Sequence, residues 1–224
     1  DTSDEEIDIR VSTVPTVYGE SVSLRLLTRD SVLKGLDTLG MTKQIVEPIN
    51  EIITKPHGIV LVTGPTGSGK STSLYAFLNT INSEDKRIMT VEDPVEFNLP
   101  MISQSQISNS RGFTYPMALR SLMRQDPEAI MIGEIRDPET AAIAVQAGLT
   151  GHMILSTIHS DSTAGVFARL INMDIEPFLL ASSITGVLGL RLLRTICPRC
   201  KTKSQQGRSI AGLCCAVHRD GEFK

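Results

Sequence analysis

The hydrophobic pattern changes character near residue 58. Before this point Ile7–Ser12 and Ser21–Leu27 alternate apolar and polar residues, as half-buried strands do. A linker-like stretch follows, and isoleucines then recur at helical spacing over residues 45–53, with Pro48 inside the pattern. Because two strands alone cannot bury a face, we expect them to belong to a small β module of which this chain holds only a part.

After residue 58, short and almost wholly apolar runs alternate with helix-like segments. The runs cover Gly58–Thr63, Arg87–Val91, Ala129–Gly133 and His152–Ser156. Such runs are typical of parallel strands that are covered on both faces. Asp137-Pro138, and Asp161 or Ser162, mark two helix starts. The pattern predicts an α/β core with a parallel or mixed sheet covered by helices.

We expect four parts along the chain. They are residues 1–30, a remnant of the N-terminal β module; 31–55, a linker and helix; 56–196, the α/β core; and 197–224, a basic tail that holds all four cysteines. The chain opens without an initiator Met, which suggests a piece of a longer protein.

Composition excludes some classes of protein. With 224 residues, 41% of them hydrophobic and 21% charged, the chain is expected to fold. Its longest uncharged apolar stretch, Pro177–Leu190, is 14 residues long, whereas a membrane-spanning helix needs about 20. Residues 191–224 hold 8 of the 22 basic and 2 of the 25 acidic residues, so the body is acidic and general nucleic-acid binding is not expected. The basic tail is a solvated end or touches a partner or an anionic membrane surface.

One motif predicts phosphate binding. Residues 64–71 read GPTGSGKS, a full match to G-x-x-x-x-G-K-[ST], between a predicted strand and a predicted helix. The backbone N–H groups of such a loop cradle phosphates, Lys70 reaches the β- and γ-phosphates, and the Ser71 hydroxyl binds Mg²⁺. The predicted cofactors are ATP and Mg²⁺, and the candidate nucleotide-binding residues are Gly64, Pro65, Thr66, Gly67, Ser68, Gly69, Lys70, Ser71 and Thr72.

Carboxylates follow two of the predicted strands. Glu92, Asp93 and Glu96 come after Arg87–Val91, and Glu134 comes after another apolar run. Ligands bind at the carboxyl edge of such sheets, so these side chains are candidates for contact with metal or water. Helix capping and surface ion pairs are the alternatives.

Four motifs in a fixed order resemble one family. The phosphate loop, the acidic segment 91–96, the segment 122–137 and the histidine segment 147–159 are similar to those of type II secretion and type IV pilus assembly ATPases. These are hexameric motors of the RecA-like P-loop class, and the resemblance covers Ile7 to about Cys200. Two departures are Glu128, where the family usually has Asp, and Leu190, where Gln is common.

The resemblance implies roles for individual residues. Glu134 supports Mg²⁺ and water, Glu96 activates the water, and Glu92 lies beside it. His152 and His159 sense the γ-phosphate or couple neighbouring subunits, unless they are core or capping imidazoles.

Arginines are implied as well, because a guanidinium binds phosphate bidentately. Arg10 and Arg25 match positions from which the family presents arginines to nucleotide. Arg120 and Arg124, expected on one helix face, and Arg169 either contact nucleotide or form ion pairs between subunits.

Cys197 and Cys200 form a C-x-x-C pair. In the family such a pair begins a structural Zn²⁺ site, but the second pair is absent as a motif here. Cys214, Cys215 and His218 offer an alternative set with a different spacing, so an intact zinc site and an altered end are both open.

The resemblance implies a Mg-dependent ATPase that acts as a homohexamer, is cytoplasmic and is peripheral to the inner membrane. It would power type II secretion, or pilus or pseudopilus assembly, with inner-membrane platform proteins as partners. A P-loop kinase, a nucleotide-binding scaffold without turnover and a pilus-retraction ATPase are the alternatives. The C-P-x-C sequence at residues 197–200 favours the assembly and secretion branch.

Overall fold

The computed structural model describes residues 7–28 and 35–194. Its first element is an antiparallel hairpin of β1 (Ile7–Thr16) and β2 (Gly19–Thr28). Both strands were predicted, and the structure lengthens them. The apolar residues of one hairpin face are between 54% and 64% exposed; they are Ile9, Val11, Val22, Leu24 and Leu26. Within the described residues the hairpin forms a two-stranded sheet separate from the other strands.

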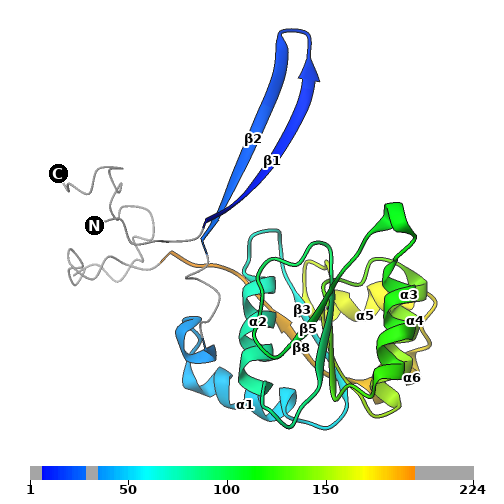
Figure 1. The fold of residues 1–224 in the computed structure, drawn as a ribbon. Helices are drawn as coiled ribbons and strands as arrows, with labels where there is room; N and C mark the ends of the chain where they lie inside the picture. The colour runs from blue at the N-terminus through cyan, green and yellow to red at the C-terminus, as the bar shows by residue number, and fades with distance from the viewer. Residues whose placement is uncertain (1–6, 29–34, 195–224) are drawn as a thin grey trace, which may run out of the picture. The chain divides into compact units, whose positions relative to one another are not determined.

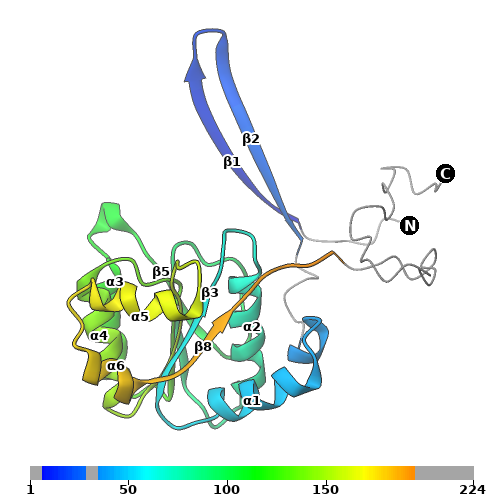
Figure 2. The ribbon, with the colours of Figure 1, turned by 180° about the vertical axis from the view of Figure 1, so that it is seen from behind.

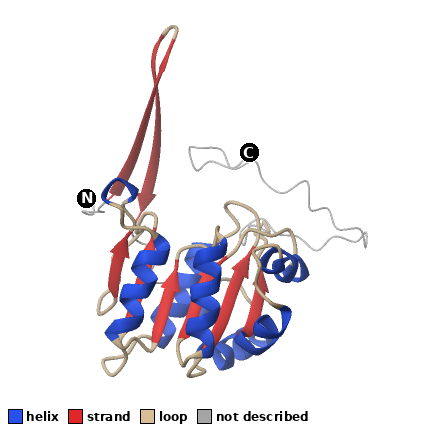
Figure 3. Cartoon of the chain, turned by 90° about the vertical axis from the view of Figure 1, so that its right-hand side faces the viewer, coloured by secondary structure: helices blue, strands red, loops and turns tan. Residues whose placement is uncertain are grey.

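The remaining elements form an α/β core, which confirms the predicted fold class. The six-stranded sheet has the order β5-β4-β6-β7-β3-β8, and every neighbouring pair is parallel, so it is not mixed. Its strands are β3 (Gly58–Thr63), β4 (Ile88–Glu92), β5 (Ser103–Gln106), β6 (Ala129–Ile132), β7 (Met153–Thr157) and β8 (Ile184–Gly189). Figure 3 shows these strands side by side with their arrows pointing the same way.

Helices cover both faces of the sheet (Figures 1 and 2). They are α1 (Lys43–Ile53), α2 (Lys70–Ile81), α3 (Tyr115–Leu122), α4 (Pro138–Leu149), α5 (Thr163–Ile171) and α6 (Pro177–Ser183), with short 3₁₀ helices at Leu36–Thr38, Asn109–Arg111 and Met123–Gln125. Helices α1 and α2 cover one face, and α3 to α6 lie on the other.

Alternation along the strands explains why both faces are apolar. In β3, Ile59 and Leu61 belong to the hydrophobic cluster under α3 to α6, whereas Val60 and Val62 belong to the cluster under α1 and α2. Successive side chains of a strand point to opposite faces, so a strand with helices on both sides needs apolar residues at every position. This is the origin of the continuous apolar runs in the sequence.

Side-chain caps begin two helices where the sequence predicted them. Asp137 accepts a hydrogen bond from the Thr140 N–H at 2.8 Å, and Pro138 follows it at the start of α4. Ser162, rather than Asp161, caps α5 and accepts from a backbone N–H three residues later at 3.0 Å.

Some predictions of secondary structure were wrong or incomplete. Arg120 and Arg124 do not share one α-helix, because α3 ends at Leu122 and a 3₁₀ helix carries Arg124. The apolar stretch Pro177–Leu190 divides into α6 and the strand β8. The strand β5, which reads SQSQ, was not predicted.

Candidate nucleotide site

The phosphate loop joins β3 to α2, and its backbone requires glycine at three positions. Gly64, Gly67 and Gly69 have φ values of +148°, +76° and +88°, a region that residues with a Cβ rarely adopt. At Gly64 a Cβ would also lie 2.5 Å from the Leu190 carbonyl oxygen and 2.7 Å from Ser68 Oγ. Backbone conformation therefore favours glycine at all three positions, and at Gly64 the neighbouring atoms also leave no room for a Cβ.

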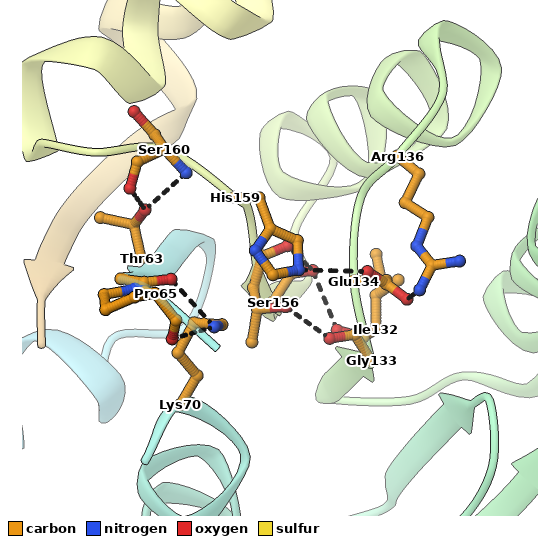
Figure 4. Close-up of polar contacts among 12 residues, drawn as sticks. Thr63, Pro65, Lys70, Ile132, Gly133, Glu134, Arg136, Ser156, His159 and Ser160 are labelled. Carbon is orange, nitrogen blue, oxygen red and sulfur yellow. Dashed lines mark hydrogen bonds and ion pairs between the residues drawn. The ribbon is translucent and has the colours of Figure 1, made fainter. Parts of the chain in front are cut away.

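Lys70 lies over the loop at the first position of α2 (Figure 4). Its Nζ donates hydrogen bonds to the carbonyl oxygens of Gly64 and Pro65, both at 2.9 Å. Burial lowers the pKa of Lys70, and the nearby Glu134 carboxylate opposes that shift. Ser71 and Thr72 follow on the first turn of α2 with exposed side chains.

A helix that starts at a glycine-rich loop can hold an anion, because its first N–H groups have no partner within the helix. The hydroxyl of Ser68 in this loop is buried, and its Oγ makes no hydrogen bond to the part of the chain that the structure describes. The loop therefore fits the phosphates of a nucleotide.

Glu134 lies just after β6, and its side chain is only 12% exposed. It forms an ion pair with Arg136, and His159 Nε2 lies 3.7 Å from its second carboxylate oxygen. The hydroxyl of Thr157 in β7 donates to the Gly133 carbonyl at 2.8 Å, which fixes the backbone next to Glu134. The structure thus brings Glu134, His159 and Lys70 to one edge of the sheet (Figure 4).

A buried threonine ties the phosphate loop to the loop that carries His159. Thr63 Oγ1 donates to the Ser160 carbonyl at 2.9 Å and accepts from the Ser160 N–H at 3.1 Å. Thr63 is the last residue of β3, and only 1% of it is exposed. Thr63 and Thr157 were not among the predicted site residues, because a threonine in an apolar run looks like an ordinary strand residue.

Glu92, at the end of β4, is 3% exposed and does not face solvent. The Tyr75 hydroxyl donates to Glu92 Oε2, while Thr90 Oγ1 and Gln104 Nε2 donate to Oε1 at 2.6 and 3.1 Å. Glu96 lies four residues later and is more open, with 28% of its side chain exposed. The two carboxylates therefore have different surroundings, and Glu96 is the one that can reach a water molecule.

Arg10 of β1 and Arg25 of β2 lie opposite each other in the register of the hairpin. Arg10 Nη2 forms an ion pair with Glu96 Oε2 at 2.6 Å, and Arg25 is exposed. Arg10 thus meets the proposed water-activating carboxylate directly.

His152 does not share the edge that holds the phosphate loop. It precedes β7, whereas His159 follows that strand, and seven residues of nearly extended chain separate them by roughly 20 Å. His152 Nδ1 lies 3.3 Å from the Ala147 carbonyl. The structure therefore separates His152 from the residues around Lys70.

A pocket of about 530 Å³ opens beside the phosphate loop. It is lined by the loop residues 64–66, by His159 to Asp161, and by Arg169 and Asn172 of the α5 region. Arg169 therefore shares a hollow with the phosphate loop. Arg120 instead forms an exposed ion pair with Glu139 at 2.7 Å.

Metal ligands were also predicted in the sequence. Cys197 and Cys200, the predicted zinc pair, lie outside the described residues. Within residues 7–28 and 35–194, no three His, Cys, Asp or Glu side chains are grouped to hold a metal ion. Mg²⁺ in nucleotide enzymes needs only one or two protein ligands beside phosphate and water, and Ser71 and Glu134 fit that need. Among the helices that the structure describes, none has the length and apolarity to cross a membrane.

The parallel sheet, the phosphate loop and the carboxylates at one edge define the P-loop nucleoside triphosphatase fold. A family model described as type II/IV secretion system protein matches residues 1–221, and the chain belongs to this family.

Individual relatives agree with this. The chain is 52% identical over 215 residues to the type II secretion system protein HxcR of Pseudomonas aeruginosa, covering 96% of this chain and 46% of that protein. It is 52% identical over 195 residues to the type II secretion system ATPase E of Vibrio cholerae, covering 87% and 39%. The solved pilus retraction motor PilT with bound ADP is 28% identical, with a TM-score of 0.70, over 84% of this chain and 58% of that one. The chain thus spans less than half the length of these two secretion proteins.

Proposed function

We propose that this chain is the ATP-hydrolysing part of a motor that powers type II protein secretion or the assembly of a pilus or pseudopilus. The observation that carries the proposal is the meeting of a complete phosphate loop, Lys70 and Glu134 at one edge of a parallel sheet. The family match and the relatives named as a secretion ATPase and a nucleotide-bound motor support it.

The loop residues 64–72 bind the phosphates through backbone N–H groups, and Lys70 exchanges its two loop carbonyls for phosphate oxygens. Mg²⁺ would be held by Ser71 and supported by Glu134, where it would offset the phosphate charge. Glu96 accepts a proton from the attacking water.

The other charged residues act around this centre. Glu92 holds the Glu96 segment through its buried hydrogen bonds and does not contact substrate itself. Arg10 and Arg25 supply positive charge near the phosphates. His159 faces Glu134 and senses the γ-phosphate, while His152 lies at the far edge and couples to a neighbouring subunit.

The working state is a homohexamer, peripheral to the inner membrane on its cytoplasmic side, with platform proteins of the machine as partners. Residues 56–196 form the hydrolytic core, and residues 1–30 belong to a β module that moves against it. The higher identity to secretion proteins than to the retraction motor favours the secretion and assembly branch.

The variant Glu134→Gln tests the proposal. We expect hydrolysis of Mg-ATP to fall at least about 100-fold, because a carboxylate is lost from the reacting centre. Nucleotide affinity should stay within about threefold, because the phosphate loop is unchanged. Glu139→Gln, on the exposed surface, is the matched control and should keep the wild-type rate. A wild-type rate in Glu134→Gln contradicts the role given to Glu134 in supporting Mg²⁺ and water. An inactive wild type that still binds ATP supports the alternative of a nucleotide-binding scaffold without turnover.

A further inference from the structure

The loop between β4 and β5 carries Glu96 but contains no helix or strand. Side chains from α2 and β5 hold it in place. The Glu96 N–H donates to the Tyr75 hydroxyl at 3.2 Å. Gln104 Oε1 accepts from the Leu99 N–H at 2.6 Å, and Gln104 Nε2 donates to the Phe97 carbonyl at 2.9 Å. Gln106 Oε1 also accepts from the Val95 N–H at 3.3 Å, so the conformation of the loop depends on side chains outside it, and Tyr75 is the one that holds the Glu96 N–H.

Tyr75 is the connection between this loop and the centre of the fold. It lies on α2, five residues after Lys70, and only 2% of it is exposed. Its hydroxyl donates to the buried Glu92 carboxylate and accepts from Glu96. Burial, together with the hydrogen bond and charge of Glu92, raises the pKa of Tyr75, so the hydroxyl keeps the proton that it donates.

The Glu92 carboxylate, which accepts the hydrogen bond from the Tyr75 hydroxyl, is itself fixed. Glu92 also receives hydrogen bonds from Thr90 and Gln104, so three donors surround one buried carboxylate. Three donors favour a single orientation of the buried Glu92 carboxylate. Removal of any one donor leaves the carboxylate with fewer hydrogen bonds and destabilises the remaining network. Tyr75 is thus oriented from one side by Glu92 and from another by the Phe97 ring, which lies nearly perpendicular to it with the ring centroids 6.0 Å apart.

We propose that Tyr75 is a positioning residue for Glu96, anchoring its backbone to α2, the helix that begins with Lys70. The inference rests on the proposed role of Glu96 in activating water. Because α2 starts at the phosphate loop, Tyr75 sets the distance between the Glu96 carboxylate and the bound phosphates. A misplacement of about 1 Å at a reacting centre can lower a rate by about 100-fold.

The variant Tyr75→Phe tests this role, because it keeps the ring and its packing and removes both hydrogen bonds. We expect kcat for ATP to fall about 10- to 100-fold, while KM and the affinity for ADP stay within about twofold. Tyr18→Phe removes the same atom from a residue that is 99% exposed, and it should change neither value. A kcat for Tyr75→Phe within twofold of wild type overturns the inference.

A double variant separates positioning from a general structural effect. In a Glu96→Gln background, Tyr75→Phe should lower kcat no further than twofold, since Tyr75 acts through the carboxylate that is already absent. If the two losses multiply instead, Tyr75 acts elsewhere and the inference is wrong. Full activity of Glu96→Gln overturns the proposed role of Glu96 and this inference with it. Loss of activity in Glu96→Gln with full activity in Tyr75→Phe overturns only this inference.

Amide hydrogen exchange gives a second measurement that does not depend on turnover. The Glu96 N–H loses its acceptor in Tyr75→Phe, so we expect its exchange to accelerate at least about 10-fold. The backbone N–H at residue 96 should exchange at the wild-type rate in Glu96→Gln, because Tyr75 is still present. Exchange at the wild-type rate in Tyr75→Phe overturns the anchoring, whether or not the chain hydrolyses ATP.

Discussion

Replacing Thr63 by valine should loosen the connection between the phosphate loop and the His159 loop. Valine has the same shape as threonine and suits a buried strand, so β3 should keep its packing. The change removes one donor and one acceptor, which bond the Ser160 carbonyl at 2.9 Å and the Ser160 N–H at 3.1 Å. The variant therefore isolates the two hydrogen bonds.

The expected loss of stability follows from those two bonds. A hydrogen bond contributes about 1 kcal/mol net, so Thr63→Val should lower the free energy of unfolding by about 2 kcal/mol. For a domain of this size the loss lowers Tm by roughly 4–8 °C. The activity should also fall, because His159 next to Ser160 faces Glu134.

Thr63→Ser is the matched control, because it keeps the hydroxyl and removes only a methyl group. Urea unfolding of the wild type and the two variants measures the free energies directly. We expect Thr63→Ser to lose about 1 kcal/mol or less. If Thr63→Val is as stable as Thr63→Ser, or more stable, the buried hydroxyl does not join the two loops as described.

Three further predictions concern the loop and the helix that follows Glu134. Gly64→Ala should abolish nucleotide binding or unfold the chain, since its Cβ would lie 2.5 Å from a carbonyl oxygen, whereas Gly35→Ala, with open space, should be neutral in a binding titration. Lys70→Ala should reduce hydrolysis to background in a phosphate-release assay, and residual wild-type turnover would remove it from the site. Asp137→Ala should destabilise the chain by about 1 kcal/mol through loss of the α4 cap, and Glu139→Ala, from an exposed pair, by less than about 0.5 kcal/mol; equal losses on unfolding would contradict the capping role.

The parts of the fold that were predictable are those with strong local patterns. The apolar runs at Gly58–Thr63 and Ala129–Gly133 are confirmed as β3 and β6, because strands covered on both faces need such residues. The strand β5 escaped because it lies at the edge of the sheet, where SQSQ can remain polar. The strand β8 escaped because local periodicity cannot locate where α6 ends within one apolar stretch.

The residues of the candidate site also differ in whether a local sequence pattern could reveal them. The phosphate loop was readable because its glycines and lysine act within one short segment. The contacts of Thr63 with Ser160 span 97 residues, and no local pattern reports them. Tyr75 reads as an apolar helix residue, and only the packed structure brings its hydroxyl between Glu92 and Glu96.

The most direct test of the account is the rate of phosphate release from Mg-ATP over a range of protein concentrations, with Lys70→Ala as the blank. We predict hydrolysis whose specific activity rises with protein concentration, because the proposed working state is a homohexamer. Release no faster than the Lys70→Ala blank at every concentration would contradict the proposal that this chain is the hydrolytic part of a motor.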